Sequence, residues 1–186
     1  MAKEATWNSE AVALAFFTRD EAQTIEALTE RIFPDDDLGP GARQAGVLVY
    51  IDRALSGAEQ NRQHLYRSGI RELDRITQAR FGRGFADCAA ADQDSLIAAM
   101  AADALPDFAA PPGALAFFEA LRAHTIEGMF SDPAHGGNRD FAGWKLLCYW
   151  GPQPSYSHEE QQLDAVIVRD RIYSAADYPL RPEEKA

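Results

Sequence analysis

The sequence has few cysteines, no cluster of positive charge and no long apolar run, and each absence excludes a class of protein. Neither cysteine lies in a Cys-x-x-Cys motif, which argues against a zinc site or thioredoxin-like chemistry. The formal net charge is −11 with no basic run, which argues against nucleic acid as a partner, because phosphate binding needs clustered Lys and Arg. No segment approaches the ~20 apolar residues that a membrane span needs.

Two further features bear on the compartment. Apolar residues 11–17 follow Glu4 and Glu10, and Lys3 is the basic residue before them, so the charge is wrong for a secretory signal. No twin-arginine pair occurs either. Cys88 and Cys148 are enough for one disulfide, but two separate buried thiols are the favoured interpretation.

What the chain does have is an ordinary globular composition. Of its 186 residues, 46% are hydrophobic and 25% are charged. A chain of this length buries about two-thirds of its unfolded surface, so we expect a single domain over residues 1–186. A loose N-terminal tail is expected over residues 1–15 and an extended C-terminal tail over residues 174–186.

The hydrophobic pattern is helical along most of the chain. Thr18 and Glu21 have the capping-box spacing, and this first helix ends at Pro34. Further helices are predicted over residues 42–55, 58–81 and 113–130, with another that Asp92 or Asp94 caps and that continues through Leu105. A short helix is predicted from His158, because Ser157 and Glu160 repeat the capping spacing; residues 165–168 form either a brief strand or the end of that helix.

These elements predict an all-α fold. We expect a single helical bundle of about five to six helices, with a long irregular loop near residues 131–156. Residues 131–152 combine Pro133, two adjacent glycines and several large aromatic rings, so this loop has a defined shape suited to contact with a partner. The expected partner interface consists of Asp132, His135, Gly136, Gly137, Asn138, Arg139, Trp144, Tyr149 and Trp150, with Arg139, Trp144 and Trp150 as main contacts.

Chemical sites are harder to find, and no catalytic, cofactor-binding or metal-binding residue is predicted. His124 and Glu127 share a helix face, but a dinuclear site needs Glu-x-x-His on two helices. His135 has no nucleophile beside it, and the acidic residues 35–37 lack the alternation of an EF-hand. Residues 136–139 are interpreted as a rigid turn rather than a phosphate cradle, because neither a Rossmann nor a Walker pattern surrounds them.

The order of residues in the loop resembles the gluconate 2-dehydrogenase subunit 3 family. The resemblance covers roughly residues 16–152, and its specific part is the loop with its trailing Gly-Trp. The residues that carry it are Asp132, Pro133, Gly136, Gly137, Asn138, Arg139, Asp140, Gly143, Trp144, Lys145, Tyr149 and Gly151. Weaker helical parts include the segment from Phe16 to Asp35, Asp52, Gly69 and the pair Phe117 and Phe118.

This resemblance implies a non-catalytic small subunit of a sugar or polyol dehydrogenase complex. The expected partner is a large catalytic subunit of the GMC type that holds FAD, and a multihaem cytochrome c is a further possible partner. The small subunit is expected to stabilise the flavoprotein and to assist its maturation or export. The resemblance implies a periplasmic location, with the cytoplasm as the alternative because no export signal is found. The rival interpretations are a metal-dependent protein that uses His124, Glu127 and His135, and a plain helical scaffold.

Overall fold

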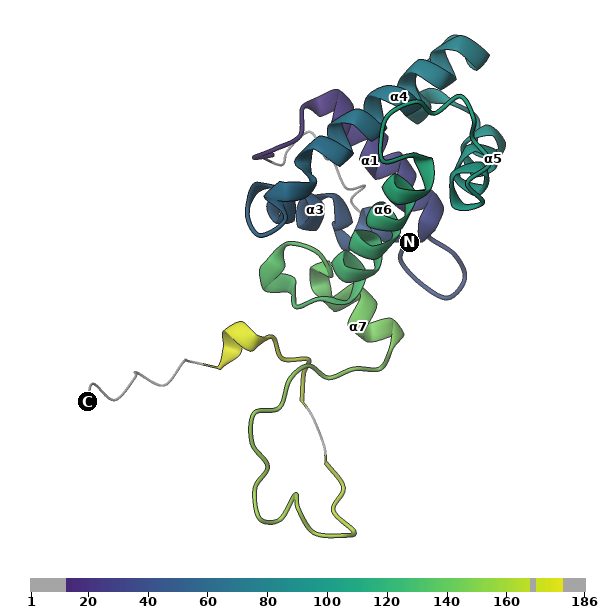
Figure 1. Cartoon of the computed structure of the whole chain (residues 1–186). Helices are drawn as coiled ribbons and strands as arrows, with labels where there is room; N and C mark the ends of the chain where they lie inside the picture. The colour runs from purple at the N-terminus through teal and green to yellow at the C-terminus, as the bar shows by residue number, and fades with distance from the viewer. Residues whose placement is uncertain (1–12, 168–169, 179–186) are drawn as a thin grey trace, which may run out of the picture.

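The structure, a computed structural model, describes residues 13–167 and 170–178, and it is all-α as predicted (Figure 1). No β-strand occurs within these ranges. Its helices are α1 (Arg19–Ile32), α2 (Ala42–Ala45), α3 (Val47–Ser56), α4 (Gln63–Phe81), α5 (Ala90–Ala101), α6 (Ala114–Phe130) and α7 (Ala142–Leu146). Short 3₁₀ turns also occur: η4 (Pro133–His135) and η5 (Arg139–Phe141) lie between α6 and α7, and η6 (Ala175–Asp177) follows α7.

Helix α6 is the centre of the bundle. It contacts α1, α2, α3, α4, α5 and α7. Figure 1 shows it in the middle of the bundle, with α7 near its C-terminal end. Its buried side chains therefore lie on more than one face, as expected of a helix enclosed by others. The core includes Ile25, Ile51, Leu73, Phe117 and Leu121, which are almost fully buried.

The predicted start of α1 is confirmed. Thr18 caps the helix: its hydroxyl accepts a hydrogen bond from the Glu21 N–H, and the Glu21 carboxylate accepts one from the Thr18 N–H. Two backbone donors at the helix start are thus satisfied by neighbours in the sequence.

Asp52 holds the chain that enters α1. This carboxylate is 3% exposed and accepts backbone N–H groups from Ala15 (2.7 Å), Phe16 (3.0 Å) and Phe17 (2.9 Å). The prediction of a loose tail over residues 1–15 is therefore wrong at Ala15, while residues 1–12 lie outside the described ranges. The carboxylate that fixes this segment lies more than thirty residues later in the chain, so local sequence patterns do not predict the contact.

Three predicted helix boundaries need correction. The helix over 42–55 is broken into α2 and α3 by Gly46, which adopts a left-handed conformation (φ 72°). The helix over 58–81 has α-helical geometry from Gln63 onward. Helix α5 begins at Ala90, so neither Asp92 nor Asp94 caps it. It ends at Ala101 rather than at Leu105. The Asp94 carboxylate instead forms an ion pair with Arg31 on α1.

The helix predicted from His158 is also wrong. The capping contacts form, since the Ser157 N–H donates to Glu160 and the Glu160 N–H donates to the Ser157 hydroxyl. Only turns follow, and residues 165–167 are neither strand nor helix, while Val168 lies outside the described ranges. A short helix needs a face to pack against, and Figure 1 shows this segment projecting away from the bundle.

Gly69 allows α4 to pack closely on α6. A Cβ at this position would lie 2.5 Å from the ring of Phe117, so the absent side chain leaves room for that ring. The neighbour that approaches Gly69 is an aromatic side chain rather than a backbone.

Candidate partner-binding surface

The buried side chain of Asn138 holds the predicted loop against its own chain. Its side chain is fully buried, and its backbone is left-handed (φ 45°), a conformation that Asn tolerates. Its amide nitrogen donates to the Ser131 carbonyl at 2.8 Å, and its amide oxygen accepts the N–H groups of Gly143 (2.9 Å) and Trp144 (3.3 Å). One side chain therefore joins the start of the loop to α7.

The same loop satisfies the carbonyl groups at the end of α6. The Asn138 N–H donates to Gly128 at 2.7 Å, and the Trp144 indole N–H donates to Phe130 at 2.7 Å. A Cβ on Gly137 would overlap the Gly128 carbonyl, so only glycine fits there. These contacts replace the hydrogen bonds that a helix C-terminus lacks.

Several predicted contact residues are thus used inside the chain. Trp144 is 5% exposed, so the expectation that it is a main partner contact is corrected: its ring supports the loop. Gly137 and Asn138 are buried, and Asp132 accepts hydrogen bonds from Ala134, Ser174 and Ala175. Because the N–H groups of Gly136 and Asn138 donate to carbonyls of this chain, a phosphate cradle is also excluded at these two positions.

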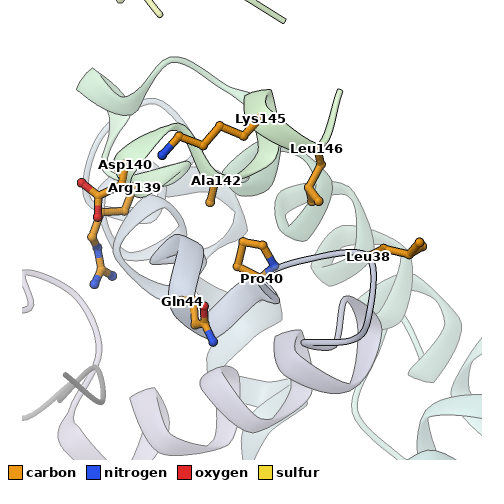
Figure 2. A pocket seen from close by; sticks show the side chains of 8 residues that line it. All are labelled: Leu38, Pro40, Gln44, Arg139, Asp140, Ala142, Lys145 and Leu146. Carbon is orange, nitrogen blue, oxygen red and sulfur yellow. The ribbon is translucent and has the colours of Figure 1, made fainter. Parts of the chain in front are cut away.

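Arg139 is half-buried beside α2. Its guanidinium packs against Gly46, where a Cβ would meet it at 2.6 Å. Burial lowers the pKa of Arg139, while Asp140 and Glu26 act in the opposite direction. Figure 2 shows Arg139 and Lys145 on the rim of a hollow, with Pro40 and Leu146 between them and Leu38. The loop therefore presents its charged side chains beside an apolar surface.

That apolar surface is a groove between the end of α1, the 35–40 turn and α7. Its volume is about 550 Å³, and the hollow in Figure 2 adjoins it through Leu38 and Leu146. Leu38 is 84% exposed and Leu147 is 61% exposed, which is costly for side chains of this size. We call it the apolar groove; its main lining residues are Phe33, Pro34, Leu38, Phe130, Leu146 and Leu147.

Tyr149 and Trp150 follow the groove in the chain and are 44% and 50% exposed. Both residues belong to the predicted partner interface, and their exposed rings are accessible to a partner. Sequence analysis missed Leu38 and Leu147. The one available signal was a lone Leu in an otherwise polar turn, and it says nothing about which surface the turn borders.

The structure does not bring His124, Glu127 and His135, the residues of the metal-site interpretation, together at one site. The His124 ring is buried, stacks on Tyr66 and shares a 2.8 Å hydrogen bond with its hydroxyl. Glu127 accepts from the Tyr50 hydroxyl at 2.9 Å; burial first, and this carboxylate second, raise the pKa of Tyr50 to about 12. His135 lines a surface pocket with Tyr50 and Glu127, without His124. Within the described ranges, no group of three or more His, Cys, Asp or Glu is arranged to hold a metal ion.

The buried His124 makes stability depend on pH. Burial lowers the pKa of His124 below its ordinary value of 6.5, although Glu127 acts in the opposite direction. The unfolded chain therefore binds the proton first, and the free energy of unfolding falls as pH drops through about 6.5. We expect urea unfolding to show lower stability at pH 5.5 than at pH 7.5. His124→Gln should flatten this slope, and an unchanged slope would contradict the assignment.

Cys88 and Cys148 are separate free thiols, as the favoured interpretation expected, but that interpretation placed both in the interior: Cys88 is buried, whereas Cys148 is exposed, so the prediction is wrong for Cys148. Within the part of the chain that the structure describes, none of the helices has both the length and the apolar character needed to cross a membrane.

The fold and the surface define an all-α protein with a stiff internal loop and an open apolar groove. A model of one protein family, described as gluconate 2-dehydrogenase subunit 3, matches residues 19–151. Because the match covers more than two thirds of the chain, this chain belongs to the gluconate 2-dehydrogenase subunit 3 family. No match was found among curated proteins or among solved structures.

Proposed function

We propose that this chain is a non-catalytic small subunit that binds and stabilises the FAD-containing catalytic subunit of a sugar dehydrogenase complex. The observation that carries the proposal is the family match over residues 19–151, because the family is one of dehydrogenase subunits. The exposed apolar groove supports it, since a partner that covers the groove removes Leu38 and Leu147 from water. The FAD and the sugar site then belong to the partner.

Stabilisation follows from binding alone. A protein that binds only the folded form of its partner shifts the folding equilibrium of that partner by mass action. The small subunit therefore need not touch substrate or flavin in order to support the catalytic subunit. Assistance with maturation or export, and electron transfer to a multihaem cytochrome c, extend the same proposal. A periplasmic location also belongs to it, with the cytoplasm as the alternative that cell fractionation distinguishes.

The test of the proposal is purification with the partner. The tagged chain is purified gently from its own cell, or after co-expression with its genomic neighbours, and its absorption spectrum is recorded. A flavin spectrum and a second, larger band on a gel are expected, and sugar oxidation is then assayed on the complex. A colourless single chain under both conditions would overturn the proposal. Stoichiometric metal in the isolated chain would instead favour the metal-dependent alternative.

The groove gives a sharper prediction for the same complex. Leu147→Ser should weaken binding of the catalytic subunit at least tenfold, because an apolar side chain at the centre of an interface is worth about 2 kcal/mol. The fold should survive, since Leu147 is 61% exposed in the free chain. Titration of the labelled small subunit against the flavoprotein measures the dissociation constant. Leu147→Met, which keeps the apolar character, is the matched control; equal affinities for all three chains would exclude the groove.

A further inference from the structure

Residues 151–167 leave the bundle at the end of α7, and residues 170–173 lie back beside this starting point; we call these two described segments the arm. Figure 1 shows this arm projecting from the end of α7 and coming back beside its own starting point. At the junction, the Tyr173 N–H donates to the Trp150 carbonyl at 3.1 Å. Gly151 (φ 90°) lies so close that a Cβ would overlap the Tyr173 carbonyl. The two ends are therefore packed against each other.

Asp132 holds the returning end of the arm in place through hydrogen bonds that we call the latch. Its carboxylate accepts the Ser174 hydroxyl and the Ala175 N–H, each at 2.7 Å. Ser174 also caps η6 with Asp177, and it is 9% exposed. The tail expected over residues 174–186 is thus anchored over residues 174–178, and the rest lies outside the described ranges. Closing a loop of this length costs entropy, and the latch offsets that cost before any partner binds.

The arm has no core of its own to bury its apolar side chains. Leu163 is fully exposed, Val166 is 86% exposed, and Tyr156 and Ile167 are also exposed. The hydrogen bonds that shape the turns are local, such as Gln161 N–H to the Ser157 carbonyl and Ala165 N–H to the Gln162 carbonyl. An anchored segment that displays apolar side chains in this way matches a surface that becomes buried on association.

Charge indicates which partner can cover the arm. Residues 157–170 contain four acidic residues and one arginine, and the whole chain carries a net charge of −11. A second copy of this chain would bring like charge against the arm, which is unfavourable. A partner surface that is apolar with a rim of Lys and Arg is complementary to it.

We infer that the arm is a clamp, that is, a segment whose two ends are already joined in the free chain and which binds the catalytic subunit. The surface it binds is apolar with Lys and Arg at its edge, and it is separate from the partner surface that covers the apolar groove. This inference rests on the proposed function, since the same complex supplies the partner. The groove and the arm then act as two linked contacts, and attachment through the first raises the effective concentration of the second. Loss of the arm contact should weaken the complex without abolishing it.

The test uses the full chain and the co-purified flavoprotein. The double variant Leu163→Ser/Val166→Ser should bind at least tenfold more weakly, whereas Leu163→Met/Val166→Ile should bind like the wild type. Ser174→Ala, which opens the latch while Asp132 still caps η4, should weaken binding several-fold and speed proteolysis within the arm. Thermal unfolding of the free chain should be unchanged for both arm double variants, because their side chains are exposed.

The possible outcomes separate the two proposals. A wild-type chain that never co-purifies with flavin overturns the proposed function and the assigned partner together. A wild-type complex that the serine double variant forms equally well leaves the proposed function intact and overturns the clamp. Concentration-dependent self-association that the serine double variant abolishes, with unchanged flavoprotein binding, identifies a second copy as the occupant and also overturns it.

Discussion

Replacing Asp52 by Ala should lower the free energy of unfolding by about 3–5 kcal/mol, because three backbone donors lose a buried charged acceptor. The Phe17 N–H is buried with its residue, so water cannot replace the carboxylate there without opening the core. The loss also frees Phe17 itself, which packs on Tyr66 with ring centroids 6.1 Å apart. Chemical denaturation monitored by circular dichroism measures the change.

Two comparisons make the Asp52 prediction specific. Asp52→Asn keeps one acceptor oxygen but turns an amide donor toward the same N–H groups, so its loss should be close to that of Ala rather than small. Asp164→Ala, at an exposed position of the arm, should change stability by less than about 0.5 kcal/mol. A change below 1 kcal/mol in the Asp52→Ala chain would show that residues 15–17 contribute little to the fold.

Features set by near neighbours in the sequence could be predicted from it. The start of α1 depends on Thr18 and Glu21, three residues apart, and the structure has the predicted capping box. The all-α class follows from the same local patterns repeated along the chain. Gly46 shows the limit: its left-handed turn lies against Arg139, more than ninety residues later, and no local pattern contains that contact.

In the candidate site too, the local backbone could be predicted from the sequence and the long-range contacts could not. Composition correctly indicated that residues 131–152 have a special backbone, since Asn138, Asp140 and Phe141 all adopt positive φ. Whether the loop faces a partner or its own chain depends on the carbonyls at the end of α6 that lack a donor within the helix, and the sequence does not show where these carbonyls lie relative to the loop. Ser157 and Glu160 show that a correct local pattern is not sufficient. Their capping contacts form, but no helix follows them.

Gly143 offers a prediction in which two physical effects have opposite signs. It lies inside α7, where helix propensity alone predicts that Gly143→Ala stabilises the chain by about 0.5–1 kcal/mol. A Cβ there would overlap the Met129 carbonyl and approach the Phe130 ring at 2.8 Å. Because a backbone carbonyl at the end of the central helix cannot move aside cheaply, we expect the overlap to dominate and stability to fall by about 3 kcal/mol or more.

Gly82→Ala is a control in which alanine causes backbone strain but no steric overlap. Gly82 has φ 69° and open space around its Cα, so alanine there should cost about 1–2 kcal/mol from the left-handed backbone alone. If Gly143→Ala destabilises more than Gly82→Ala despite its helical backbone, the contact between α7 and α6 must be the cause. A stabilised Gly143→Ala chain would mean that α7 can shift away from Met129. The loop would then be held chiefly by Asn138 rather than by close packing on the end of α6.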